Sequence, residues 1–293
     1  MQRSICCTPL QLMPTDVRTH TLAYSPCPND TYIFAALTNG LLDGAPEVRV
    51  HFADIEELNL AAARADYELT KVSYGAIPSL MRDYRILRCG GALGRGCGPL
   101  VVTRPGLAGN LAAVRDLRVA IPGERTTAFM LLQLALGGRP RTQQMRFDAI
   151  IPAVASGQID AGLIIHESRF TYANAGLVSV ADLGDWWESV TGMPIPLGAI
   201  LARNDLGDER IHAIDQAIRS SLLFARANEA AVMPFVREHA FEMSDEVMRK
   251  HIELYVNDYS DDIGDDGIAA VNELFARARA AGVLEADATP RFS

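Results

Sequence analysis

The sequence TLAYSPCPNDTYIFAALTNG, residues 21–40, passes from a strand into a helix through two prolines. Residues 21–24 predict a short strand, which Pro26 and Pro28 end, since proline fixes φ and removes a backbone donor. A helix is predicted from Asn29, because Asn or Asp before an apolar-periodic run is typical of a helix start, and Gly40 predicts its end. This order of elements is typical of an α/β fold.

The same order recurs further along the chain. The first helix is followed by a predicted strand at 48–52, a helix at 56–64 and a strand at 67–72. The second passage has a strand at 117–121, a loop at 122–125, helices at 126–136 and 148–156, and a strand at 159–165. The repeat predicts two α/β lobes of similar plan, each with a mainly parallel sheet.

Two extended runs, 100–103 and 195–203, are predicted to join the lobes. Residues 205–284 are predicted to be almost entirely helical and to pack on the outside of lobe one. We expect residues 1–102 and 200–293 to form lobe one and residues 103–199 to form lobe two. Two crossing strands would make a hinge with a cleft beside it.

Composition excludes several classes of protein. The 293 residues carry 27 Lys and Arg against 36 Asp and Glu, a net charge of −9, so the positive field needed for nucleic-acid binding is missing. No apolar run approaches the roughly 18 residues of a membrane span. Residues 1–20 lack the apolar block of a signal peptide, so we expect a loose N-terminal extension and a cytoplasmic protein. The sequence does not indicate an oligomeric state.

The cysteines predict neither disulfides nor a metal site. They are odd in number, and none is spaced C-x-x-C: Cys6, Cys7, Cys27, Cys89 and Cys97. Free, mostly buried thiols are expected. The acidic segment 257–264 lacks the Gly and Glu that a calcium loop needs, so it predicts a solvated loop. The glycine-rich segment 90–99 fits neither a P-loop nor a dinucleotide fingerprint, and it predicts tight backbone near the hinge.

Two helix starts are candidate binding sites. At Ser25 and Asn29, unpaired N–H groups would face the carboxyl edge of the sheet, where ligands of α/β folds bind. A rigid structural turn explains this segment equally well. At Thr126, Thr127 and Ala128, a glycine loop and two hydroxyls suit a carboxylate or phosphate, although a simple threonine cap is the alternative.

His166 is a candidate general base, because it follows a buried strand and imidazole titrates near neutral pH. A structural histidine with satisfied hydrogen bonds is the alternative. Lys71 and Ser73 share one face of a strand and are candidate substrate contacts. The remaining histidines are interpreted as structural or peripheral: His20, His51, His212, His239 and His251.

With these residues in view, the chain resembles the 1,4-dihydroxy-6-naphthoate synthases of the futalosine route to menaquinone. The matching stretches are SPCPNDTYIF (25–34), DIEELN (54–59), TKVSYGA (70–76), GGALGRGCGPLVV (90–102), GERTTA (123–128) and IIHESRFTY (164–172). They span most of the two lobes, whereas the C-terminal helices match only in character. The sister family, chorismate dehydratase, lacks the SPCPND and GRGCGP segments.

The resemblance implies the two-lobe fold of type II periplasmic binding proteins, used in the cytoplasm as an enzyme. It implies a lyase that splits cyclic dehypoxanthinylfutalosine into 1,4-dihydroxy-6-naphthoate and dihydroxyacetone, without a cofactor. The family's base aligns with His166, and its substrate contacts align with Lys71, Val72, Ser73, Thr127 and Ala128. Two alternatives stay open: a solute-binding protein without chemistry, which the fold permits, and a chorismate dehydratase. In each case the expected partner is a small carboxylate.

Overall fold

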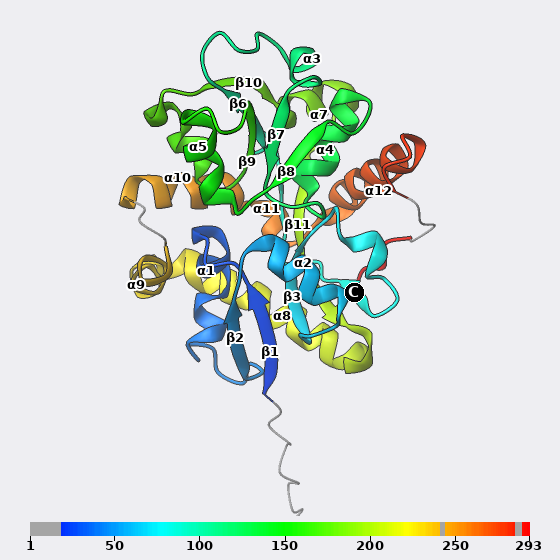
Figure 1. Ribbon diagram of the computed structural model, residues 1–293. Coiled ribbons are helices and arrows are strands. Elements are labelled where there is room, and N and C mark those ends of the chain that lie inside the picture. Colours follow the sequence, from blue (N-terminus) through cyan, green and yellow to red (C-terminus); the bar gives the residue numbers. More distant parts are fainter. Residues whose placement is uncertain (1–18, 241–243, 285–288) are drawn as a thin grey trace, which may run out of the picture.

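The computed structural model describes residues 19–240, 244–284 and 289–293, and it consists of two α/β lobes, one above the other in Figure 1. Residues 1–18 of the expected N-terminal extension, including Cys6 and Cys7, lie outside the described residues. His20 does not belong to a loose extension, because it is buried at the start of the first strand. Cys27, Cys89 and Cys97 are free and buried, as predicted.

The lower lobe is built on a six-stranded sheet. Its strands run in the order β2-β1-β3-β11-β4, and β5 pairs with the free part of β11. The strands are β1 (His20–Tyr24), β2 (Val48–Phe52), β3 (Leu69–Ser73), β4 (Tyr84–Ile86), β5 (Ala92–Gly94) and β11 (Ile195–Arg203). β2, β1 and β3 are parallel, whereas β11 runs antiparallel to β3, β4 and β5.

The upper lobe is built on a five-stranded sheet in the order β10-β6-β9-β7-β8. Its strands are β6 (Leu100–Thr103), β7 (Arg118–Ile121), β8 (Arg141–Gln144), β9 (Ala161–Ile164) and β10 (Val178–Asp182). β8, β7 and β9 are parallel, and β6 is antiparallel to both neighbours. In each sheet all strands but one run in the same direction, as expected of mainly parallel sheets. The exceptions are β11 in the lower sheet and β6 in the upper sheet, which lie where the chain passes between the lobes.

The chain crosses between the sheets twice. It leaves the first sheet after β5, enters the second at β6, and returns to the first through β11. Gly98 lies on the outgoing segment, where an added Cβ would be 2.1 Å from the main-chain nitrogen of Gly184. Only glycine allows this approach, which explains the glycine at position 98. The division of the chain into lobes at residues 102 and 200 stays a prediction.

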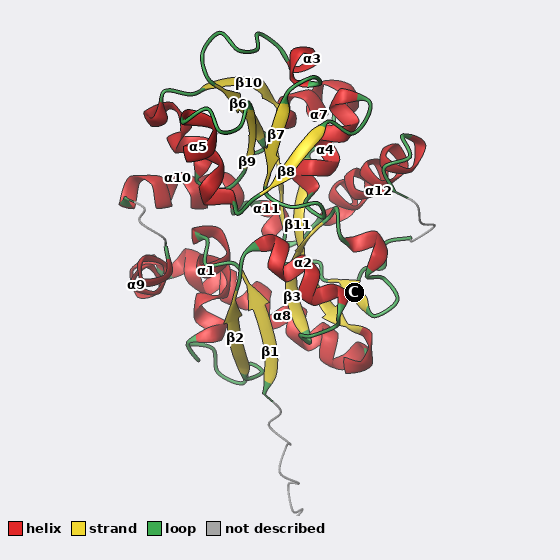
Figure 2. Ribbon diagram, in the orientation of Figure 1, coloured by secondary structure: helices red, strands yellow, loops and turns green. Residues whose placement is uncertain are grey.

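Helices cover both sheets (Figure 2). They are α1 (Pro28–Thr38), α2 (Ile55–Ala63), α3 (Leu111–Val114), α4 (Thr127–Leu136), α5 (Phe147–Ala155), α6 (Ser168–Thr171), α7 (Leu183–Thr191), α8 (Asp208–Ala227), α9 (Glu229–His239), α10 (Asp245–Tyr255), α11 (Asp258–Asp261) and α12 (Gly264–Ala280). α8 and α9 pack on α1 of the lower lobe, as predicted. α12 contacts both β11 and α4, so the C-terminal helices do not cover lobe one alone.

The acidic segment 257–264 forms the short helix α11 and is not a solvated loop. Asn257 caps this helix, and Asp261 and Asp262 pair with Arg219 and Arg88. The carboxylates thus fix the C-terminal region to the lower lobe. In the part of the chain that the structure describes, no helix combines the length and apolar character needed to cross a membrane.

Candidate active site

A cavity of about 660 Å³, its open mouth included, lies between the two lobes. All of the predicted site residues except Val72 line it: Ser25, Asn29, Lys71, Ser73, Thr126, Thr127, Ala128 and His166. Val72 points the other way along β3 and packs in the core. Any contact of Val72 with a ligand would therefore come from its main chain.

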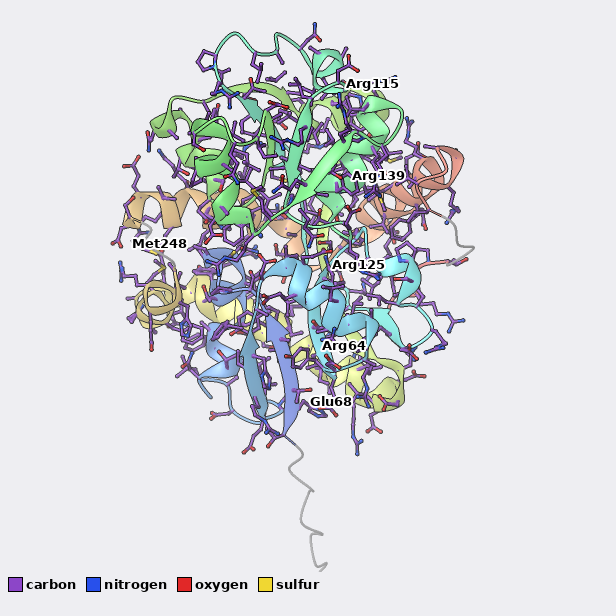
Figure 3. All side chains as sticks on the ribbon, in the orientation of Figure 1. Arg64, Glu68, Arg115, Arg125, Arg139 and Met248 are labelled. Atoms are coloured by element: carbon purple, nitrogen blue, oxygen red, sulfur yellow. The ribbon has the colours of Figure 1, made fainter. Side chains whose placement is uncertain are left out.

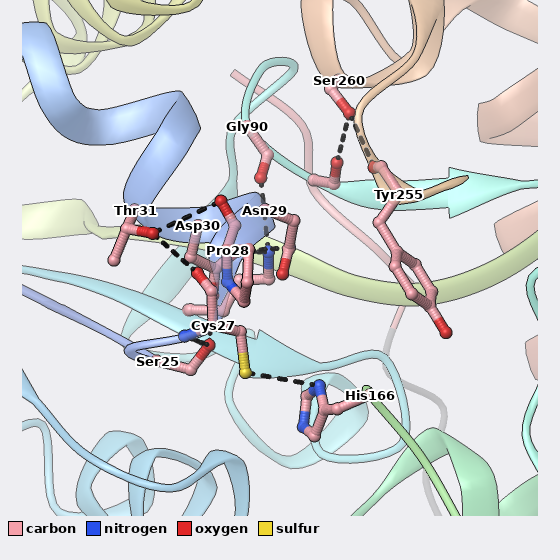
Figure 4. A network of polar contacts seen from close by, with 12 residues as sticks. Ser25, Cys27, Pro28, Asn29, Asp30, Thr31, Gly90, His166, Tyr255 and Ser260 are labelled. Atoms are coloured by element: carbon pink, nitrogen blue, oxygen red, sulfur yellow. Dashed lines mark hydrogen bonds and ion pairs between the residues drawn. The ribbon is translucent and has the colours of Figure 1, made fainter. Parts of the chain in front are cut away.

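Asp30, in the first turn of α1, organises the lower wall of the cavity. Its carboxylate accepts hydrogen bonds from Ser25 Oγ (2.7 Å), Asn29 Nδ2 (2.8 Å) and Lys71 Nζ (2.5 Å). Asp30 and Lys71 are both buried, and the ammonium also lies 3.4 Å from the carbonyl oxygen of Gly90. Figure 4 shows this network around the start of the helix. Sequence reasoning used Asp30 only as a helix start and missed this role.

The start of α1 therefore holds a carboxylate of its own. A helix N-terminus attracts an anion through its free N–H groups and its dipole, and Asp30 already supplies that anion. Ser25, Asn29 and Lys71 are engaged in holding Asp30. Their expected contact with a ligand anion at this helix is consequently not favoured by the geometry.

His166 follows β9 as predicted, but its backbone is in the left-handed region with φ of 56°. Together with Ala65 it is one of two non-glycine residues with positive φ in the described ranges. Its Nδ1 lies 3.6 Å from Cys27 Sγ (Figure 4). Its ring and that of Phe147 meet edge to face, with 5.2 Å between centroids. The unusual backbone turns the imidazole from the upper lobe toward the start of α1.

The electrostatic surroundings keep His166 and Cys27 neutral. Burial lowers the pKa of His166 to about 4; Asp30 opposes this shift, and Lys71 adds to it. Burial raises the pKa of the Cys27 thiol, with Glu167 and Asp30 adding to the effect. A neutral imidazole beside a neutral thiol can accept a proton but carries no charge at neutral pH.

The start of α4 forms the opposite wall. Thr126 is the N-cap: its hydroxyl accepts the amide of Phe129 (3.2 Å) and donates to the carbonyl of Gly123 (2.8 Å). The first turn of α4 contains no acidic residue, in contrast to α1. The amides of Thr127 and Ala128 have no acceptor within the helix, so they are available to a ligand.

The two lobes contact each other next to the cavity. Thr127 Oγ1 donates to the carbonyl of Leu197 (2.6 Å) and accepts the amide of Gly75 (3.2 Å). From α2, Glu56 accepts the amide of Arg125 at 3.1 Å; Figure 3 shows Arg125 at the junction of the lobes. The hydroxyl of Thr127, predicted to bind substrate, is thus used between the lobes.

Helix α10 contributes two lining residues that sequence reasoning missed. His251 is buried and Tyr255 nearly so, and their rings lie 4.6 Å apart. His251 was expected on a C-terminal helix without a site role; it lies beside the cavity because α10 packs against α1 and β5. The spacing of four residues on one helix face was the available signal. Among the described residues, no group of three or more His, Cys, Asp or Glu is placed to hold a metal ion.

This chain is similar in sequence to a family of biosynthetic proteins and similar in fold to solute-binding proteins. A family model described as menaquinone biosynthesis matches residues 20–280. Two relatives are named 1,4-dihydroxy-6-naphthoate synthase: one from Thermus thermophilus (49% identity, 92% of this chain, 98% of the relative) and one from Streptomyces coelicolor (47%, 90% and 94%). The alkanesulfonate-binding protein SsuA from Xanthomonas axonopodis pv. citri, solved with MOPS, has a TM-score of 0.68 at 12% identity, with 92% of this chain and 94% of that one covered. This structural likeness confirms the predicted periplasmic-binding-protein-like fold.

Proposed function

Because this chain belongs to the menaquinone biosynthesis family, we propose that it splits cyclic dehypoxanthinylfutalosine into 1,4-dihydroxy-6-naphthoate and dihydroxyacetone. It is an enzyme, a lyase of that route. One observation supports the finer assignment most: a neutral imidazole and an uncompensated helix start face the same cavity. The cytoplasmic location stays a prediction.

The aromatic carboxylate of the substrate is assigned to the start of α4. Its two free first-turn amides and its dipole favour an anion, and no acid of its own competes for them. The start of α1 is less favourable to an anion, because Asp30 already places a carboxylate in its first turn. Glu56 lies near the loop before α4 but is not among the residues that line the cavity.

The sugar portion is then placed toward His166, which acts as the general base. Its Nε2 accepts a proton from a sugar hydroxyl while Nδ1–H points at Cys27 Sγ, since a neutral imidazole has one donor and one acceptor. The oxygen becomes a carbonyl as the adjacent carbon–carbon bond breaks in a retro-aldol sense. The electron pair of that bond passes to the conjugated carbonyl of the aromatic fragment, whose oxygen takes up a proton and becomes a naphthol hydroxyl. Formation of the second aromatic ring drives the step. Apolar lining residues such as Ile55, Ile165 and Leu197 exclude water from the reaction.

The test is conversion of the cyclic substrate by wild type and His166→Gln. A positioned base contributes about 10²–10⁴-fold, so kcat should fall by that factor. His212→Gln on the exposed face of α8 is the matched control and should keep full activity. Turnover by His166→Gln within a few-fold of wild type would contradict the role of the base. Loss of water from chorismate, or recovery of the cyclic substrate unchanged from wild type, would instead favour one of the alternative functions.

A further inference from the structure

A second imidazole, His251, faces the cavity from helix α10. It is 1% exposed and lines the cavity together with Tyr255, one turn further along the same helix. α10 packs against α1, which carries Asp30, and against β5 of the crossing segment. The C-terminal region thus brings a polar ring to a wall that is otherwise built by the two lobes.

Neither ring nitrogen of His251 has a hydrogen-bond partner among the described residues. Buried polar groups in folded proteins are nearly always hydrogen-bonded, and an unpaired one costs about 1–3 kcal/mol. A packing role would be filled at lower cost by phenylalanine, whose ring can pack against Tyr255 in the same tilted arrangement. Orphaned nitrogens on a cavity wall therefore indicate a ligand contact.

The charge state of the His251 ring indicates which kind of ligand group it can bind. Burial lowers the pKa of His251, and the nearby His166 and Lys71 lower it further. The ring is consequently neutral, with one N–H donor and one acceptor nitrogen. Such a pair matches a hydroxyl, which donates and accepts, better than a carboxylate, which only accepts.

We propose that His251 is a substrate-binding residue that hydrogen-bonds the sugar hydroxyls and so orients them toward His166. This inference rests on the proposed function. The naphthoate end, held at the start of α4, would not touch His251. The residue then contributes to recognition of the sugar and not of the aromatic carboxylate.

The experiment measures binding without turnover. In a His166→Ala background, calorimetry gives the Kd of cyclic dehypoxanthinylfutalosine and of 1,4-dihydroxy-6-naphthoate. Adding His251→Phe should weaken binding of the cyclic compound by about 10-fold, the effect of leaving a hydrogen-bonded group unpaired. Binding of the naphthoate, which lacks the sugar, should stay within about two-fold. His251→Gln should recover part of the loss, and His212→Phe is the control that should change neither Kd.

Stability separates a binding role from a structural one. His251→Phe removes two unpaired nitrogens and keeps a ring packed against Tyr255, so its Tm should equal or exceed that of wild type. If His251→Phe fails to fold, His251→Leu replaces it, and it should weaken binding of the cyclic compound by the same factor. Unchanged affinity for the cyclic compound, or equal weakening for both ligands, would overturn the proposal. A different outcome is also possible: binding of the cyclic compound depends on His251, but wild type does not convert that compound. This result would overturn the proposed reaction and leave the binding role of His251 intact.

Discussion

His166 combines two properties that are individually costly. A positive φ costs a non-glycine residue about 1 kcal/mol or more, and burial of an imidazole shifts it toward the neutral form. Both serve the same end, since the backbone aims the ring at the start of α1 and burial keeps it able to accept a proton. Strained residues of this kind occur most often at functional sites.

The pH profile of catalysis should report the lowered pKa of His166. Protonation abolishes a general base, so kcat/KM falls as pH drops below the pKa of the free enzyme. An ordinary histidine would give this fall near pH 6.5, whereas His166 should give it near 4. Activity should therefore be flat between pH 7 and 5 wherever circular dichroism shows the protein folded. An acid limb centred near pH 6.5 would contradict the neutral, buried environment.

At this scale the sequence predicted some of the site. His166 could be placed because a buried strand ends just before it, and Thr126 because hydroxyls favour helix caps. Asp30 could not be distinguished from an ordinary first-turn acid, because its partner Lys71 is distant in sequence and meets it only after the sheet forms. His251 could not be placed because helical spacing does not say which element the helix will pack against.

The two helix starts at the cavity look alike in sequence but differ electrostatically. α1 begins with an internal carboxylate that is paired with Lys71, whereas α4 begins with hydroxyls and no acid. The first is therefore a closed structural unit and the second is available to an anion. The geometry thus favours the structural interpretation for the start of α1 and the binding interpretation for the start of α4.

The ion pair between Asp30 and Lys71 should dominate the stability of the α1 start. Lys71→Met leaves a buried carboxylate without its cation, so the free energy of unfolding in urea should fall by about 3–5 kcal/mol. The double variant Asp30→Asn with Lys71→Met should recover much of this loss, because no buried charge remains. Lys250→Met, which removes an exposed lysine paired with Glu246, should change stability by less than about 1 kcal/mol. A loss that small for Lys71→Met itself would refute the importance of the pair.

Helices whose ends are marked by proline, glycine or a capping residue could be located from the sequence, whereas short strands could not. Proline, glycine and capping residues mark both ends of α1 and α4, and the predicted bounds agree within about two residues. β4 and β5 contain three residues each, too few for alternation to be recognised. Their places depend on pairing with β11, which is a property of the assembled sheet.

At the scale of the whole molecule, the lobes are joined by more than the crossing strands. Glu56 and Thr127 bond across the junction, and an added Cβ at Gly75 would lie 2.7 Å from the carbonyl oxygen of Arg125. The contacts lie next to the cavity and join the elements that form its two walls. Moving the lobes apart to widen the mouth of the cavity would therefore require these polar bonds to break.

Removing one of these bonds should make the molecule more open. Glu56→Ala eliminates the acceptor for the amide of Arg125, so the radius of gyration from small-angle scattering should rise without ligand and return on addition of 1,4-dihydroxy-6-naphthoate. KM should rise several-fold for the same reason. Glu124→Ala is the matched control, because Glu124 pairs with Arg139 within the upper lobe. An unchanged radius in Glu56→Ala would show that the bond between Glu56 and Arg125 does not set the distance between the lobes.

The left-handed backbone at position 166 also shapes how this protein can diverge. A duplicated copy released from its reaction would gain stability by exchanging the imidazole for glycine or asparagine, which adopt a positive φ more readily. A mutation back to histidine would bring back the backbone strain without at once bringing back activity. The exchange would therefore be difficult to reverse during evolution. Homologues with glycine or asparagine at position 166 are therefore expected to keep the fold and to lack the catalytic activity.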